Sequence, residues 1–163
     1  AYSAVPFPRA YNGLVDVCVL LFYGVVPVFF PYYVIAGEYS TLAFILALSL
    51  GFLSINILVV NNYRDYEEDK SNNKRTTIVL FGRRFGEVFY LANGIMALIL
   101  AAAVFWEKKW LLIFYAAFAG LFLYTWREMK ILEGKALNKV LGHTARNVFI
   151  FALLLTASIL LSQ

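Results

Sequence analysis

The residues best suited to chemistry lie in one polar stretch at positions 61–77, which reads NNYRDYEEDKSNNKRTT. If this stretch continues a helix, Asn61, Asp65 and Asp69 fall at i, i+4 and i+8 and share one face. Two carboxylates one helical turn apart suit a divalent cation that prefers oxygen ligands. Because Mg²⁺ usually binds one or two carboxylates together with substrate phosphates, Asp65 and Asp69 are candidate Mg²⁺ ligands. Asn61 adds a neutral oxygen on the same face.

Two basic residues follow the acidic pair. Lys74 and Arg75 are suited to hold the outer oxygens of a diphosphate. A second interpretation is a solvated helix end, in which Arg64 forms ordinary surface pairs with Glu67 or Glu68. The spacing of two aspartates by itself leaves both interpretations open.

The composition places these residues in a membrane protein. The chain of 163 residues is 62% hydrophobic and 15% charged, whereas soluble domains are about 45–50% apolar and about 25% charged. That excess excludes a water-soluble single domain, and it also excludes a disordered chain. The single cysteine, Cys18, excludes a disulfide framework and a cysteine-rich metal site.

Five stretches are long and apolar enough to cross a bilayer as helices, for which about 20 mostly apolar residues suffice. Their positions are 14–36, 41–60, 85–105, 110–126 and 145–161. Pro27 and Pro31 predict a kink in the first of them. No stretch alternates apolar and polar residues as a membrane barrel strand would. The sequence therefore predicts an all-α integral membrane protein, with residues 1–163 forming a single transmembrane domain of five helices.

The basic residues predict how the chain is oriented. With five crossings, residues 1–13, 61–84 and 127–146 share one side and hold 12 of the 14 Lys and Arg residues, while Lys108 and Lys109 lie on the other. Because basic loops stay in the cytoplasm, we expect an inner (cytoplasmic) membrane protein with these three segments cytoplasmic. The loops are short and lie at the membrane, so nucleic-acid binding is not expected.

Other polar residues have simpler expected roles. Ser54, Asn56 and Asn93 are expected to form hydrogen bonds between helices, although Ser54 and Asn56 are also placed to line a cavity. Asp16 is expected to cap a helix or to snorkel. His143 has no metal-binding partners in the sequence and is expected to be structural. Cys18 is expected only to pack.

The polar stretch 61–77, with Phe81-Gly82 after it, resembles the second aspartate-rich motif of the UbiA-type intramembrane aromatic prenyltransferases. It is most similar to the dihydroxynaphthoate-prenylating branch, whose motif reads roughly N-N-x-R-D-x-x-x-D-x-x-x-G-K-R-T. The flanking runs FPRAYNGLVDV and PYYVIAG are similar to the fifth helix of these enzymes and its exit. Asn73 stands at the usual glycine position and tolerates a left-handed backbone better than most residues. The matching positions are Asn61, Asn62, Arg64, Asp65, Asp69, Lys74, Arg75 and Thr76.

The resemblance implies a nine-helix fold around a central cavity, of which this chain would be helices five to nine. Mg²⁺ held by Asp65 and Asp69 would clamp the diphosphate of a polyprenyl diphosphate against a first aspartate motif. That first motif is absent from this chain, so the resemblance implies a missing N-terminal half that carries it. The residues implied to bind the diphosphate are Asn61, Asn62, Arg64, Lys74 and Arg75, with Arg146 as a further candidate that could instead contact the acceptor's carboxylate.

The implied reaction is ionisation of the allylic C–O bond and capture of the carbocation by 1,4-dihydroxy-2-naphthoate, which loses its carboxylate and gives demethylmenaquinone. We expect this fragment alone to be inactive. Three alternatives stay open: another aromatic acceptor, a transporter module, and a non-catalytic membrane scaffold. A transporter would carry ionisable residues in mid-span, whereas the span interiors hold Asn, Ser and Thr.

Overall fold

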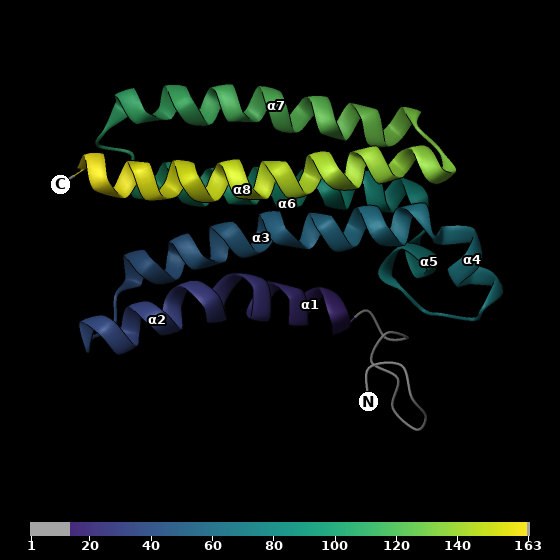
Figure 1. The fold of residues 1–163 in the computed structure, drawn as a ribbon, viewed down its shortest axis with the longest axis horizontal. Coiled ribbons are helices and arrows are strands. Elements are labelled where there is room, and N and C mark those ends of the chain that lie inside the picture. Colours follow the sequence, from purple (N-terminus) through teal and green to yellow (C-terminus); the bar gives the residue numbers. More distant parts are fainter. Residues whose placement is uncertain (1–13, 163) are drawn as a thin grey trace.

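The computed structural model describes residues 14–162, so the predicted cytoplasmic segment 1–13 lies outside the described residues. Within them the chain is helical and contains no β-strand (Figure 1). In chain order the elements are α1 (Leu14–Leu20), the π-helix η2 (Leu21–Val25), α2 (Val26–Ala36), α3 (Thr41–Arg64), α4 (Tyr66–Ser71), α5 (Thr77–Phe81), α6 (Arg83–Val104), the 3-10 helix η3 (Lys109–Leu111), α7 (Leu112–Ile131), the 3-10 helix η4 (Gly134–Ala136) and α8 (Leu137–Ser162).

Five segments in the described part of the chain are long and apolar enough to cross a membrane. They are Val15–Ala36, Thr41–Arg64, Arg83–Val104, Lys109–Ile131 and Gly134–Ser162. A helix satisfies its backbone hydrogen bonds internally, as a spanning segment in lipid must. The prediction of an all-α, multi-pass membrane protein is therefore confirmed.

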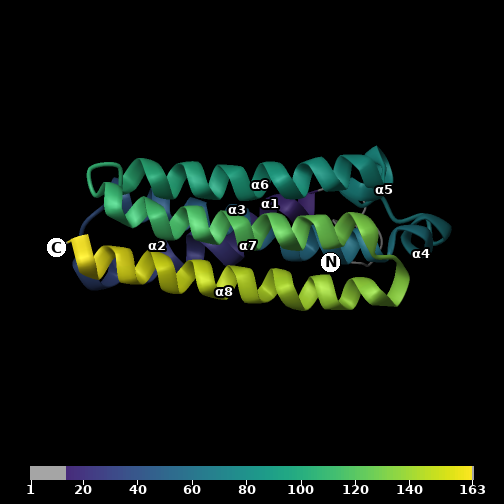
Figure 2. The ribbon, with the colours of Figure 1, turned by 90° about the horizontal axis from the view of Figure 1, so that it is seen from above.

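The long helix α3 lies at the centre of the bundle. It packs against the first span, α6 and α8, while α7 packs against α6 and α8 on the side away from α1 and α2 (Figures 1 and 2). In the most apolar stretch of α3, 61% of the residues are buried. The corresponding share is 28% in each of the three later spans and 11% in the first. The polar stretch predicted to do chemistry begins at the end of this central helix.

The predicted helix ends differ from the observed ones. The sequence predicts a loop over 127–146, but α7 continues to Ile131 and α8 starts at Leu137. Hydropathy marks only the part of a helix that matches the hydrocarbon core, and charged helical turns can continue beyond it. The true connection between the last two spans is therefore short.

The first span is irregular where its prolines predicted a kink. The π-helix Leu21–Val25 directly precedes α2, in which Pro27 occupies the first turn and Pro31 lies inside the helix. A proline has no N–H to give to the carbonyl four residues earlier. The wider π-turn is one way in which a helix accommodates that loss.

The first span and α3 approach each other at two glycines. A Cβ added to Gly24 would lie 2.3 Å from the Cα of Gly51, whose own backbone cannot move aside. Small residues permit this close approach of helices in membranes.

We expect Gly24→Ala to lower the free energy of unfolding by about 1–3 kcal/mol, as overpacking of a buried contact typically does. Thermal unfolding of the complete protein in detergent measures this. Gly142→Ala on α8 is the control, because a Cβ there has no heavy atom within 4 Å. Equal unfolding midpoints for the two variants would contradict the expectation.

Candidate active site at the end of α3

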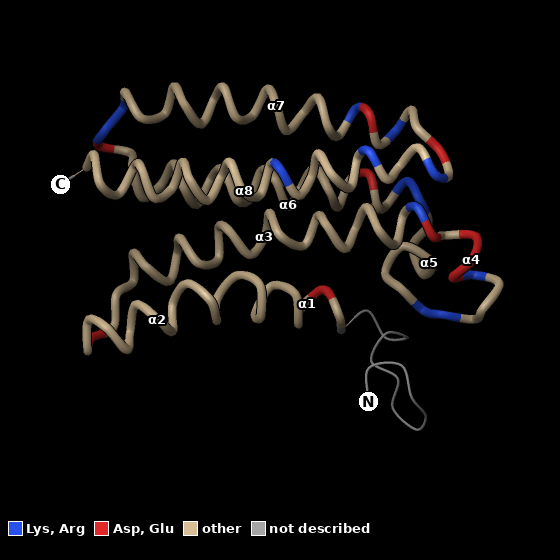
Figure 3. Tube along the Cα trace, in the orientation of Figure 1, with Lys and Arg blue, Asp and Glu red and all other residues tan. Residues whose placement is uncertain are grey.

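Charged residues gather at the end of the bundle where α3 ends and α8 begins (Figure 3). Lys108 and Lys109 lie at the opposite end, beside the turn before α7. The segments that carry most Lys and Arg residues thus share one end of the bundle, as the alternating spans predicted.

The predicted continuous helix through the polar stretch is wrong at one position. Helix α3 ends at Arg64, and Asp65 has φ −90° and ψ 10° before α4 begins at Tyr66. Two backbone hydrogen bonds of helical spacing are still formed at this break. The N–H of Asp65 donates to the Asn61 carbonyl (3.0 Å), and the N–H of Asp69 donates to the Asp65 carbonyl (2.8 Å). The three residues therefore still follow one another a turn apart, on an interrupted helix.

Asp65 is held by the arginine that precedes it. The Arg64 guanidinium donates from Nε to Oδ1 (2.7 Å) and from Nη2 to Oδ2 (2.8 Å) of Asp65, and Nη2 also donates to Oδ1 of Asn61 (2.9 Å). This two-point contact with Arg64 lowers the pKa of Asp65 below its ordinary value. The carboxylate is therefore ionised at neutral pH, as a metal ligand must be.

Asp69 is held by Lys74 across a tight turn. Its side chain is only 5% exposed, and Lys74 donates from Nζ to Oδ1 at 2.6 Å. This hydrogen bond raises the pKa of Lys74. Asn73, with φ 55°, provides the left-handed backbone that turns Lys74 back toward Asp69, so asparagine serves here in the role that the resemblance gives to glycine.

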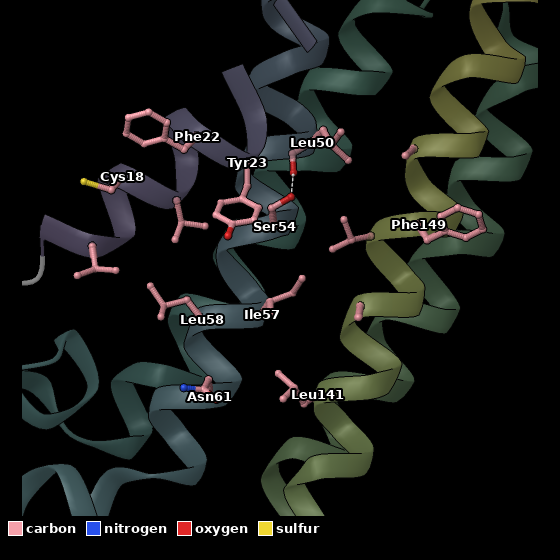
Figure 4. A pocket seen from close by; sticks show the side chains of 15 residues that line it. Cys18, Phe22, Tyr23, Leu50, Ser54, Ile57, Leu58, Asn61, Leu141 and Phe149 are labelled. Atoms are coloured by element: carbon pink, nitrogen blue, oxygen red, sulfur yellow. Dashed lines mark hydrogen bonds between the residues drawn. The ribbon is translucent and has the colours of Figure 1, made fainter. Parts of the chain in front are cut away.

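An apolar pocket of about 830 Å³ runs from this polar end between the first span, α3 and α8 (Figure 4). Its walls include Cys18 and Tyr23 from the first span, Ser54 and Asn61 from α3, and Ala152 from α8. Asn61 is the residue that the pocket and the charged cluster share, because it also accepts the hydrogen bond from Arg64. The pocket suits a long apolar ligand with an anionic head at the Asn61 end.

The remaining predicted site residues differ in their burial and in their place relative to this cluster. Asn62 is buried in the last turn of α3. Arg75 is exposed beyond Lys74, and Arg146 is exposed on α8, outside the lining of the pocket. The structure thus joins Asn61, Arg64 and Asp65 directly, whereas Arg146 does not share their contacts.

One residue of this cluster was missed by the sequence analysis. Asn138, at the start of α8, accepts a hydrogen bond from Nη1 of Arg64 at 2.7 Å, although the two lie 74 positions apart. A single asparagine in a predicted loop carries no signal of such a contact. Cys18 also lines the pocket, where the sequence predicted only packing.

Polar residues inside the bundle mostly bond as predicted. Asn93 donates to the Asn56 side chain (3.2 Å), and Asn56 donates to the carbonyl of Tyr90 (3.0 Å), which links α3 to α6. For Ser54 the predicted bond between helices is wrong, because it donates to the carbonyl of Leu50 in its own helix and lines the pocket.

Two other predictions concern titratable residues near the charged end. Asp16, which was expected to cap a helix or to snorkel, lies in the first turn of α1, where its carboxylate accepts a hydrogen bond from Thr77 and so links α1 to α5. The Nδ1 of His143 lies 2.6 Å from Oε2 of Glu128, and Oε1 of the same carboxylate accepts from Lys139. These contacts agree with the structural role expected of His143. This cluster ties α7 to α8.

Comparison with known proteins identifies the family of this chain. A model of the UbiA prenyltransferase family matches residues 1–154, and the chain belongs to this family. A relative named 1,4-dihydroxy-2-naphthoate octaprenyltransferase in Escherichia coli is 29% identical over 99% of this chain and 54% of its own length. Relatives of the same name in Mycobacterium leprae and Haemophilus influenzae are 32% and 31% identical over 64% and 66% of this chain, and 37% of each of those proteins.

The chain spans about half the length, or less, of the relatives it matches. No solved structure matches it. The predicted family is confirmed.

Proposed function

We propose that this chain is the C-terminal half of an enzyme that transfers a polyprenyl group from polyprenyl diphosphate to 1,4-dihydroxy-2-naphthoate, forming demethylmenaquinol, the reduced form of demethylmenaquinone. The observation that carries the proposal is a pair of motif carboxylates, Asp65 and Asp69, held by Arg64 and Lys74. Arg64 also bonds to Asn61, which lines the apolar pocket. The names of the three relatives support the choice of reaction.

The carboxylates of Asp65 and Asp69 are suited to form part of a Mg²⁺ site. Among residues 14–162, no group of three or more His, Cys, Asp or Glu side chains is placed to hold a metal ion. Mg²⁺ needs no such cage, because it binds through one or two carboxylates plus substrate phosphates. Asp65 and Asp69 would hold it on this half, and the first aspartate motif of the missing N-terminal half would complete the site. When bound, the metal supplies positive charge that stabilises the departing diphosphate.

The basic residues of the motif also stabilise the departing diphosphate. Arg64 and Lys74 pair with Asp65 and Asp69 and so lie where a metal-bound diphosphate would sit. The N–H groups of Arg64 and Lys74 that do not bond to protein acceptors are left for phosphate oxygens, where they favour the charge that develops as the allylic C–O bond breaks. Further donors to the diphosphate are assigned to Asn61, Asn62, Arg75 and Arg146.

The apolar pocket binds the other part of the substrate, its prenyl tail. The prenyl tail lies along its apolar walls, and their dryness keeps water from capturing the allylic cation. The diphosphate leaves with the electron pair of the C–O bond. A ring carbon of dihydroxynaphthoate forms the new C–C bond, and the carboxylate at that carbon departs as CO₂. The electron pair of the broken bond returns to the ring, so the product is the quinol, demethylmenaquinol.

We place the charged end of the bundle on the cytoplasmic side of the inner membrane, with residues 1–163 as one transmembrane domain in the lipid bilayer. The concentration of Lys and Arg at that end supports this orientation. Labelling of a cysteine introduced at position 72 with an impermeant reagent tests it, because the proposal fails if labelling occurs only from the periplasm.

The direct test of the function uses the complete protein in detergent or liposomes, with Mg²⁺, a polyprenyl diphosphate and either 1,4-dihydroxy-2-naphthoate or 4-hydroxybenzoate. We expect demethylmenaquinol, detected as demethylmenaquinone after oxidation in air, from the first acceptor and no product from the second. Prenylation of hydroxybenzoate alone would assign another acceptor, and failure with every aromatic acceptor would favour a non-catalytic scaffold.

A further inference from the structure

Arg64 is the most connected side chain of the motif. Its guanidinium makes four hydrogen bonds, two to Asp65, one to Asn61 and one to Asn138. The first three bonds go to two residues of the same stretch of chain, at the end of α3. Asn138 is different, because it comes from the first turn of α8. This bond therefore ties the motif to a separate membrane helix.

The geometry of the pair between Arg64 and Asp65 needs such an anchor. Neighbouring residues in a regular helix do not face each other, and here the non-helical backbone of Asp65 brings its carboxylate to the guanidinium. The guanidinium is a rigid plane whose donors keep fixed directions. When Asn138 holds Nη1, the plane is fixed, and with it the Nε and Nη2 edge that grips the two oxygens of Asp65.

Asn138 also sits at a suitable place on α8. It precedes Leu141 by three positions and Ala145 by seven, and both of these line the pocket. Residues at this spacing share a helix face, so Asn138 continues the pocket-lining face of α8 toward the charged end. Figure 4 shows Asn61 on α3 and Leu141 on α8 near the same end of the pocket. The hydrogen bond from Arg64 to Asn138 thus bridges the two helices beside the pocket's polar end.

We infer that Asn138 is a positioning residue of the diphosphate site, which fixes Arg64 and through it the Asp65 carboxylate. The inference rests on the proposed function, since it assumes that Asp65 holds the metal bound with the diphosphate. The acceptor oxygen of Asn138, rather than its size or its place on the surface, is the property that matters.

The test measures metal binding in the complete protein, with Mn²⁺ as an electron paramagnetic resonance probe and farnesyl thiodiphosphate as an uncleaved ligand. We expect Asn138→Leu and Asn138→Ala to weaken Mn²⁺ binding about 10-fold, in the range typical of residues that orient a metal ligand. Asn138→Asp retains an acceptor oxygen and should bind Mn²⁺ nearly as the unchanged protein does. Asn72→Leu, which alters an exposed asparagine at the same end of the bundle, should change nothing.

A double-mutant cycle separates positioning from a general effect on stability. In an Arg64→Leu background, Asn138→Leu should have no further effect on Mn²⁺ binding, because the anchored guanidinium is gone. Additive losses, or a failure of Asn138→Asp to rescue, would overturn the inference, as would unchanged Mn²⁺ affinity in Asn138→Leu. If Asp65→Asn itself left Mn²⁺ binding intact, the proposed function would fail first, whatever Asn138 does.

Discussion

Prenyl transfer by the complete protein is expected to fall by about 10²-fold or more when either Asp65 or Asp69 is replaced by asparagine. Asparagine keeps the size of the side chain and one oxygen, but it removes the negative charge that a metal bound with diphosphate requires. Initial rates over a range of Mg²⁺ concentrations measure the effect. Higher Mg²⁺ should recover part of the rate, since the loss lies in metal binding.

The same short helix offers a matched control. Glu67 and Glu68 are exposed carboxylates of α4, in the same turns as Asp69. Glu67→Gln and Glu68→Gln remove the same charge without removing a proposed ligand, so their rates should stay near the unchanged value. Near-normal rates for both aspartate variants, or equal losses in the glutamate variants, would rule out the assigned metal site.

The second large effect is expected from narrowing the pocket. Ala152 of α8 lines it, and a tryptophan there would occupy space that the prenyl tail needs. Each methylene removed from an apolar site costs about 0.8 kcal/mol, so displacing only two of them raises KM for a long polyprenyl diphosphate about 10-fold. Dimethylallyl diphosphate, whose tail is short, should be affected much less.

Steady-state kinetics with prenyl diphosphates of increasing length measure this dependence. Ala157→Trp is the control, because Ala157 is exposed on the same helix and lies outside the pocket lining. An increase in KM that is the same for every chain length, or the same in both variants, would place the tail somewhere other than this pocket.

The sequence predicts the class of this fold well for a physical reason. In lipid a spanning backbone must be helical or form a closed barrel, so hydropathy alone fixes the type of each long element. The predicted end of α7 and the predicted start of α8 were wrong. The charged turns around Glu128 and Lys139 are helical although they lie outside the apolar core. Hydropathy has no means of distinguishing such a turn from a loop.

The contacts within the candidate site were predicted in part. The spacing of Asp65 and Asp69 and the basic residues after them indicated an anionic ligand with a metal, and the motif's pairing of Asp69 with Lys74 follows from a short local turn. The interruption at Asp65 was not predicted, because the spacing of the motif does not show where the helix breaks and lets the Asp65 carboxylate reach Arg64. Asn138 was missed because its contact joins residues far apart in the chain, and one sequence without an alignment gives no signal of such pairs.

The position of the motif at the tip of the central helix has a consequence for how substrate arrives. Asn61 follows directly on the apolar part of α3, so the charged cluster begins at the depth where hydrocarbon gives way to headgroups. A polyprenyl diphosphate anchored in the leaflet carries its own pyrophosphate at that same level. In the proposed enzyme, encounter is then a two-dimensional search by lateral diffusion, and the lipid substrate never has to leave the bilayer to reach the carboxylates.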